Sequence, residues 1–358
     1  MLATSTTDIQ DTAMMLPQEN TTTANTTTCI QHPTATMNTI LAVVYSFIFI
    51  IGLVLNSLPL WVYFCHTHTK NCVNVYLKNL AIADFLLILS LPVKITAYST
   101  SYTIVRQIYC TISATVFYLN MYASILFMEY IGANRYLKIV KPLETYKWQT
   151  VKAAKYISLG TWILLLSIGV GHMYLSSNTP GTTSKCNVSN VSVSGKLFSV
   201  VVHTSSLILF MFVLTSLCFF YVQMSKRLKG NTFSSNIKLR KSRNNILVLV
   251  TVFSVCFVPY HIVRLPYVLA NSKIITSCFW ENHLHYLKEF ATVLSSLNAC
   301  LDPMIYFIFC KAFRAKLCLE KYLIKKNTLP ANQARGNEEI DFSIQGATAM
   351  NTLDQSHI

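Results

Sequence analysis

The chain has 358 residues, of which 53% are hydrophobic and only 12% are charged, and its formal net charge is +15. A soluble domain would carry about 25% charged residues, so this composition excludes an ordinary soluble protein. A bilayer is crossed by about 20 apolar residues in a helix, and seven stretches of that kind are present. They cover residues 40–64, 73–98, 107–137, 154–177, 197–224, 245–270 and 286–309. We therefore predict an all-α fold, a seven-transmembrane helix bundle.

Lysine and arginine residues in the loops predict the orientation of the chain. They are concentrated after the third, fifth and seventh spans, and the loops on the opposite side of the membrane are sparse, with Arg106, Lys185, Lys196 and Lys273. This bias predicts a multi-pass plasma-membrane protein with an extracellular N-terminus and a cytoplasmic C-terminus. The positive charge then belongs to the cytoplasmic face, and we expect the lipid bilayer, not a nucleic-acid polymer, as its partner.

The segments outside the spans fit this orientation. Residues 1–39 are rich in Thr and Asn, which predicts disorder, and they carry glycosylation sequons at Asn20 and Asn25. Two more sequons, at Asn187 and Asn190, precede the fifth span. All four lie on the predicted extracellular side. We divide the chain into this N-terminus, a membrane domain over residues 40–320 with a short amphipathic helix on the inner membrane surface, and a flexible tail over residues 321–358.

The cysteines divide in the same way. Cys29, Cys110, Cys186 and Cys278 fall at or beyond the predicted outer ends of spans, where disulfides form. Sequence alone allows three pairings of four cysteines. On the inner side, Cys318 follows a basic amphipathic segment, which fits palmitoylation. A free cysteine near the membrane explains its position equally well.

The sequence contains no metal-ligand spacing, phosphate-binding loop or nucleophile motif, so we expect no enzyme activity, no cofactor and no metal-ligand cluster. Polar groups inside spans are the functional candidates instead. In the stretch Cys256-Phe-Val-Pro-Tyr-His-Ile-Val-Arg264, Pro259 predicts a kink, and His261 and Arg264 are groups that hydrocarbon penalises. The stretch predicts a bent helix beside a site for a charged group.

A second set of polar residues, Asn56, Asp84, Asn298 and Asp302, lies at mid to inner depth of the spans. An isolated carboxylate there is costly, and shared hydrogen bonds, a bound sodium ion or a proton would each lower that cost. A static polar patch that joins helices explains the same spacing.

An ordered series of motifs resembles the rhodopsin-type G-protein-coupled receptors over about residues 40–320. The series comprises Asn56, Leu80-Ala-Ile-Ala-Asp84, Asn134-Arg135-Tyr136, Trp162, Pro259 and Asp302-Pro303-Met-Ile-Tyr306. Each triplet alone is a weak signal, but the complete series, with each motif in its expected span, is specific.

The resemblance implies roles for individual residues. Cys110 would bridge to Cys186, and Asp84, Asn298 and Asp302 would form a sodium-linked allosteric centre. Arg135 would engage a heterotrimeric G protein once the sixth span swings outward. Further activation residues implied by position are Asn134, Tyr136, Tyr221, Phe257, Pro259, Asp302, Pro303 and Tyr306.

Asn134 departs from this family, in which an Asp or Glu usually precedes the arginine. An amide can hydrogen-bond to Arg135 but forms no ion pair with it, which leads to the hypothesis of raised basal signalling. Phe257 and Asp302 also depart from the common family residues, tryptophan and asparagine. Both replacements are typical of one branch of the family.

That branch is the purinergic one, which includes nucleotide and nucleotide-sugar receptors, lysophospholipid receptors and orphans. The stretches that resemble it are Cys256–Arg264, Phe117–Tyr122, Lys288-Glu289 and Cys300–Pro303. The resemblance implies a second outer bridge, between Cys29 and Cys278.

Arg264 and Lys288 are the predicted contacts for an anion, because a guanidinium and an ammonium suit phosphate. Tyr260 and His261 share a helix face with Arg264, and Tyr118 and His203 are further candidate contacts. Glu289 is expected to point away from Lys288, because adjacent helix positions do not face each other. The alternative is that both cations only extend to the membrane interface.

The expected function is a receptor for an extracellular anionic, nucleotide-like ligand that activates an inhibitory-class G protein by population shift. A lysophospholipid or peptide ligand, or a decoy that binds without coupling, are the alternatives. A transporter or channel is the least supported, since no pair of interrupted half-helices is present. The Ser/Thr-containing tail is compatible with arrestin binding.

Overall fold

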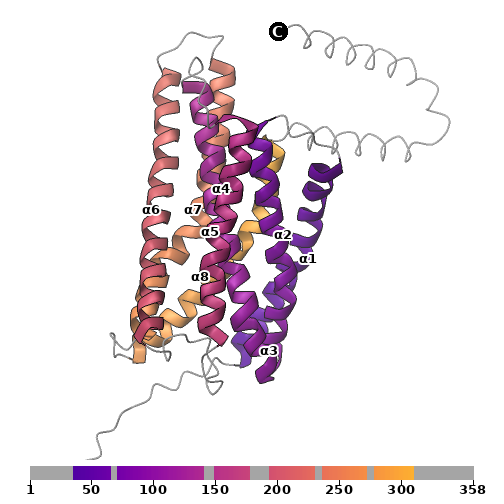
Figure 1. Ribbon diagram of the computed structural model, residues 1–358, viewed down its shortest axis with the longest axis vertical. Coiled ribbons are helices and arrows are strands. Elements are labelled where there is room, and N and C mark those ends of the chain that lie inside the picture. The colour runs from indigo at the N-terminus through magenta and orange to yellow at the C-terminus, as the bar shows by residue number, and fades with distance from the viewer. Residues whose placement is uncertain are drawn as a thin grey trace, which may run out of the picture. The chain divides into compact units, whose positions relative to one another are not determined.

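The computed structural model describes residues 35–65, 71–140, 149–177, 193–229, 236–271 and 278–309. These residues form the helices α1 (Ala35–Cys65), α2 (Cys72–Ser99), α3 (Thr103–Ile108), η1 (Tyr109–Ser113), α4 (Ala114–Val140), α5 (Val151–Ser177), α6 (Val193–Lys229), α7 (Asn236–Asn271) and α8 (Cys278–Phe309). Seven spans in this part of the chain are long and apolar enough to cross a membrane, with α3, η1 and α4 making one of them. The predicted seven-helix bundle is confirmed (Figure 1).

Each spanning helix begins before its predicted span. The sixth span was predicted over residues 245–270, whereas α7 begins at Asn236, and α1 begins at Ala35 rather than at residue 40. Hydropathy detects only the part of a helix that matches the hydrocarbon thickness. The polar turns at the ends, such as Asn236–Asn244, continue the helix outside that layer. The predicted spans are short for this physical reason.

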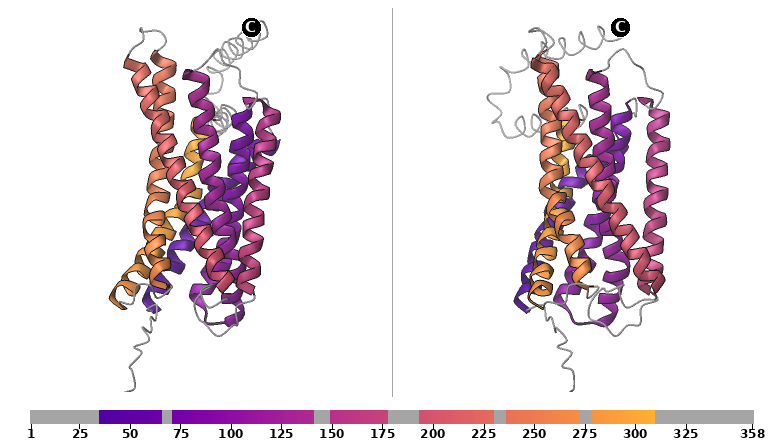
Figure 2. Two further views of the ribbon diagram at one scale, coloured as in Figure 1. Left: turned by 60° about the vertical axis from the view of Figure 1, so that its left-hand side comes forward. Right: turned by 90° about the vertical axis from the view of Figure 1, so that its left-hand side faces the viewer.

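The helices pack in an order that brings distant segments together. α2 lies against both α1 and α4, and α8 lies against α7 and α1. α6 packs along α7, as the upper parts of both views in Figure 2 show. A Cβ on Gly52 of α1 would lie 2.2 Å from Ile88 Cδ1 of α2, so a larger residue there would require the Ile88 side chain to move.

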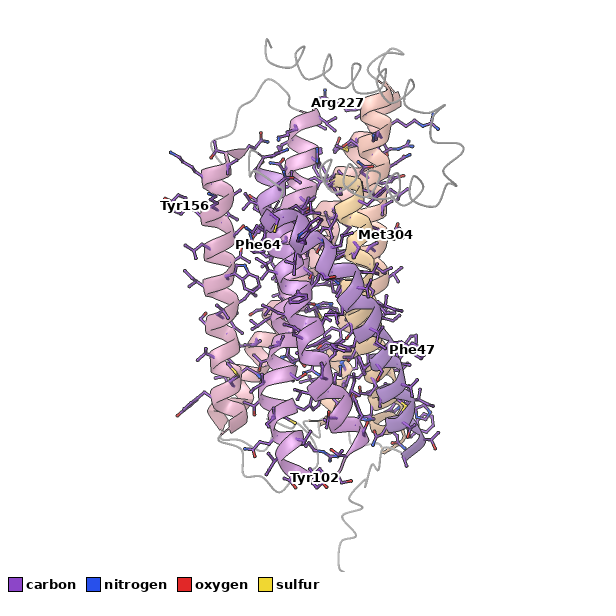
Figure 3. All side chains as sticks on the ribbon, turned by 90° about the vertical axis from the view of Figure 1, so that its right-hand side faces the viewer. Phe47, Phe64, Tyr102, Tyr156, Arg227 and Met304 are labelled. Atoms are coloured by element: carbon purple, nitrogen blue, oxygen red, sulfur yellow. The ribbon has the colours of Figure 1, made fainter. Side chains whose placement is uncertain are left out.

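The surface of the bundle is apolar. Phe47, Phe64, Tyr156 and Met304 project from its outside (Figure 3), and each is more than half exposed. Exposed aromatic and aliphatic groups on this scale mark a surface that water does not cover. Tyr102 and Arg227 lie at opposite ends of the bundle (Figure 3), and we name the two ends after them.

Prolines lie inside four of the described spanning helices. Pro59 lies in α1, Pro92 in α2, Pro259 and Pro266 in α7, and Pro303 in α8. Pro303 has no N–H for the carbonyl of Ala299, four residues earlier. Asn56 Nδ2 of α1 donates to that carbonyl at 2.8 Å. Asn56 therefore has a structural role, because it satisfies a carbonyl that the proline leaves without a backbone donor.

Candidate functional site

A buried polar centre occupies the middle of the bundle. Asp84 of α2 is fully buried, and both of its carboxyl oxygens accept hydrogen bonds. Asn120 Nδ2 of α4 donates to Oδ1 at 3.2 Å, and the Tyr306 hydroxyl of α8 donates to Oδ2 at 2.5 Å. This centre therefore joins three helices through one carboxyl group.

Asp302 extends the same centre along α8. Asn298 Nδ2 donates to Asp302 Oδ2 at 2.9 Å, and Asp302 lies close enough to Asp84 for the two carboxyl groups to interact. Asp302 Oδ1 and Asn298 Oδ1 are buried without hydrogen-bond partners. A shared proton or a small cation with a preference for oxygen ligands would offset the repulsion and use these oxygens. The residues predicted for a sodium-linked centre are thus brought together, and sodium binding itself stays a prediction.

Tyr306→Phe is expected to lower the stability of the purified protein, because it leaves Asp84 Oδ2 without this donor. A lost hydrogen bond to a buried or charged acceptor costs about 1–3 kcal/mol. Tyr156→Phe is the matched control, since the Tyr156 side chain lies on the outside of α5 and is 74% exposed. Thermal unfolding in detergent would measure both. Equal midpoints for Tyr306→Phe and the parent protein would contradict this assignment.

Arg264 of α7 is the centre of a second polar site, toward the Tyr102 end. Arg264 Nη2 donates to His203 Nε2 of α6 at 2.8 Å, which requires that nitrogen to be an acceptor. The guanidinium also lies 5.5 Å from the centroid of the Tyr118 ring and 5.8 Å from that of Tyr267. Its Nε is buried without a partner. Arg264 therefore has a donor available within a site built from α4, α6 and α7.

Lys288 of α8 reaches the same site, and here one prediction is wrong. Its ammonium lies 5.5 Å from the centroid of the Tyr267 ring, so the two predicted cations share this ring. Glu289 does not point away: Lys288 Nζ donates to Glu289 Oε1. The rule that adjacent helix positions do not face each other describes where side chains leave the helix. The side chains of Lys288 and Glu289 are long enough to bend toward each other beyond that point. Tyr98 of α2 holds the carboxylate in place by donating to its other oxygen at 2.8 Å.

Lys94 of α2 is a third cation at this site, which the sequence prediction missed. It is only 4% exposed, and its ammonium lies 3.9 Å from the ring centroid of Tyr45 and 5.3 Å from that of Phe117. The Tyr45 ring in turn stacks on Tyr98, which bonds to Glu289. An unbroken series of contacts thus connects Lys94 to Arg264. A lysine in an apolar span is the signal that could have identified it.

Tyr260 and His261 lie beside Arg264 but are packed in the core. His261 is 5% exposed; its ring stacks on Phe210 with centroids 3.9 Å apart, and its Nδ1 donates to the Phe257 carbonyl at 2.9 Å. Its Nε2 lies 3.5 Å from the Tyr122 hydroxyl. Any ligand contact would require these packed groups to move, so their roles as ligand contacts stay predictions.

The third site lies toward the Arg227 end and surrounds Arg135. Asn134 Nδ2 donates to Cys72 Sγ of α2 at 3.0 Å, so the amide is directed at α2 rather than at Arg135. Arg135 Nη2 donates to the Phe309 carbonyl at 3.3 Å, and the Arg135 guanidinium lies 5.1 Å from the centroid of the Phe309 ring. The arginine is therefore held by α8 in this arrangement.

Two neighbouring activation candidates lie at the same end of the bundle, and a third lies between the two ends. The Tyr136 ring stacks on Phe220 of α6, with centroids 4.8 Å apart. Both residues, and Tyr221, pack against a small buried cluster of Val140, Met224 and Ile246. Phe257 is fully buried about two turns before Arg264, in the helix that Pro259 interrupts. A continuous core thus connects the two ends through α4, α6 and α7.

Comparison with known protein families decides the assignment. The model of the 7 transmembrane receptor (rhodopsin family) matches residues 55–306. The chain belongs to this family. It is therefore a multi-pass membrane receptor of the G-protein-coupled kind, not an enzyme.

Individual relatives place the receptor in the purinergic-like branch. Purinoceptor 14 of Bos taurus is 38% identical over 294 residues, which cover 79% of this chain and 86% of the relative. Purinoceptor 13 of Rattus norvegicus is 34% identical over 279 residues, covering 77% and 83%. G-protein coupled receptor 87 of Mus musculus is 32% identical over 286 residues, covering 78% and 79%. The predicted family and branch are confirmed.

Part of the sequence prediction lies outside the described residues. This part comprises the sequons at Asn20, Asn25, Asn187 and Asn190, the amphipathic helix after α8, and Cys29, Cys186 and Cys318. Cys110, in the π-helical turn η1, is disulfide-bonded. Cys278 begins α8, and its side chain is outside the described set. The identities of both predicted bridges stay predictions.

Proposed function

We propose that the receptor binds an extracellular anionic, nucleotide-like ligand at the Arg264 site and activates a heterotrimeric G protein of the inhibitory class. The observation that carries the proposal is the convergence of Arg264 and Lys288 on the Tyr267 ring. With Lys94, the connected site contains three cations and one carboxylate, Glu289, among the residues that the structure describes. The excess positive charge favours an anion.

Aromatic rings beside the cations support a ligand with a flat, apolar part. Tyr118 lies next to the guanidinium and makes an edge contact with the His172 ring of α5, with centroids 5.9 Å apart. Such rings stack on a nucleobase, while arginine forms a fork on phosphate. Two of the relatives are named purinoceptors, which supports a purine or related nucleotide as the ligand class.

The orientation proposed for the receptor follows from its loop charges. It places the Tyr102 end, with the Arg264 site, outside the cell, and the Arg227 end, with Arg135, in the cytoplasm. A ligand that prefers one arrangement of α6 and α7 would then shift the population of states presented to the G protein. Arrestin is proposed as a further cytoplasmic partner.

A guanine-nucleotide exchange screen tests the proposal. Membranes with the receptor and an inhibitory-class G protein would be exposed to nucleotides, nucleotide sugars, lysophospholipids and anionic peptides. We expect a member of the first two groups to accelerate exchange. Activation only by lysophospholipids or peptides would support those ligand classes instead, and ligand binding without exchange on any G protein would identify a decoy.

A further inference from the structure

Glu129 is a carboxyl group in the middle of α4 that neither the ligand site nor the polar centre uses. It is 9% exposed and lies six residues before Arg135 in the same helix. An ionisable side chain at this depth of a membrane helix is costly to keep and usually has a function. Its contacts therefore indicate what that function is.

Glu129 is bonded to α6 by one oxygen only. Ser216 Oγ of α6 donates to Glu129 Oε1 at 2.5 Å, whereas Glu129 Oε2 is buried without a hydrogen-bond partner. A second polar contact between α4 and α6, from Tyr122 to Ser206, lies nearer the Tyr102 end. The Glu129 bond therefore joins α4 to α6 in the half of the bundle that contains Arg135.

Gly132 of α4 packs closely against α6 beside this bond. A Cβ on Gly132, one turn after Glu129, would lie 2.7 Å from Leu217 Cδ2 of α6. The missing side chain makes room for Leu217 of α6, next to Ser216. A larger residue at position 132 would require the Leu217 side chain to move at the level of this contact.

The bond is also close to residues that are predicted to take part in coupling. Tyr221 lies five residues after Ser216 in α6, and Tyr136 lies seven residues after Glu129 in α4, stacked on Phe220. Because α6 packs along α7, a displacement of α7 at the Arg227 end would also move α6. A bond from α4 to α6 opposes that displacement.

We propose that Glu129 is a positioning residue for G-protein activation, which through Ser216 holds α6 against α4 and so limits signalling without ligand. The inference rests on the proposed coupling to a G protein. We expect this restraint to be modest, because only Oε1 of the carboxyl group has a hydrogen-bond partner when α6 lies against α4, and Oε2 has none. The restraint acts on α6, whereas the contacts of Arg135 described above act on α8.

The test compares Ser216→Ala with two variants that keep the restraint or leave it untouched. Ser216→Thr retains a hydroxyl at the same position. Thr215→Val removes a neighbouring hydroxyl that bonds to carbonyls of its own helix, at 2.8 Å and 2.9 Å. Agonist-free nucleotide exchange per receptor at the cell surface is the first readout. A fluorescent amino acid at the exposed position Lys241, near the start of α7, is the second.

We expect Ser216→Ala to raise agonist-free exchange about two- to tenfold, the range that one net hydrogen bond supports. The fluorophore should report a displaced α7 in the same variant, and Ser216→Thr and Thr215→Val should match the parent receptor. Glu129→Gln, whose amide oxygen can still accept from Ser216, should also match it. Glu129→Leu combined with Ser216→Ala should add nothing to the effect of Ser216→Ala alone.

The inference is overturned if Ser216→Ala leaves both exchange and fluorescence unchanged, or if Thr215→Val changes them equally. A rise in Glu129→Leu that is absent in Ser216→Ala would also overturn it, since Glu129 would then act through another group. The fluorescence readout needs neither ligand nor G protein. Failure of the inference is therefore distinguishable from failure of the proposed ligand or coupling class.

Discussion

Arg264→Ala is expected to weaken activation by an anionic agonist about 10- to 150-fold. The substitution removes a hydrogen bond to a charged group, worth about 1.5–3 kcal/mol. The potency of the agonist on Arg264→Lys should lie between its potency on the parent receptor and on Arg264→Ala, because lysine restores the charge but not the planar fork. Dose–response curves for nucleotide exchange, normalised to surface expression, measure the shift.

Two further variants sharpen this expectation. Lys288→Ala should also reduce potency, but less, because part of the Lys288 charge is already neutralised by Glu289. His283→Ala removes an exposed side chain of α8 at the same end of the bundle, whose Nδ1 bonds to the Phe279 carbonyl of its own helix, and should leave potency unchanged. Full potency of an anionic agonist in both Arg264→Ala and Lys288→Ala would refute the proposed site.

Asn134→Asp is expected to lower agonist-free signalling about tenfold. A carboxylate at this position can compete with the Phe309 carbonyl for the Arg135 guanidinium and add an ion pair that favours the resting state; a tenfold change needs about 1.4 kcal/mol. Adjacent residues can form such a pair in this receptor, as Lys288 and Glu289 do. Agonist-free nucleotide exchange would measure the change.

Asn134→Ala is the matched control for this substitution. It removes the hydrogen bond to Cys72 without adding charge, so agonist-free signalling should not fall. If Asn134→Asp leaves the basal rate where it was, or if Asn134→Ala lowers it equally, the missing carboxylate does not set basal activity.

The fold was predictable because an apolar stretch of about 20 residues is enough to predict a membrane-spanning helix. Seven apolar stretches correspond to seven spans, and only their polar ends, such as Asn236–Asn244, were missed. The motif positions were predictable for the same reason: Asp84, Asn298 and Asp302 sit in the core because no apolar surface could accommodate them. Their hydrogen-bond partners were not all predictable, since the contacts of Asn120 and the Tyr306 hydroxyl depend on how α4 and α8 pack against α2.

The ligand site was predictable only in part. Arg264, Lys288 and Tyr118 were identified from the sequence and lie in one network. Lys94 and Tyr267 were missed, because their contribution arises from contacts among α2, α7 and α8, which spacing within one helix does not reveal. The Lys288–Glu289 pair shows the same limit: its geometry is fixed by Tyr98 of another helix. Contacts between helices, rather than positions within them, determine this site.

The central claim, that Arg264 receives the anionic part of the ligand, is tested most directly by equilibrium binding to purified receptor. A nucleotide agonist and its matched nucleoside, which lacks phosphate, would each be measured on the parent receptor and on Arg264→Ala. We predict that the parent receptor strongly prefers the nucleotide, and that Arg264→Ala loses most of this preference while its affinity for the nucleoside is unchanged. An equal preference in both proteins, or no preference in the parent receptor, would contradict the claim.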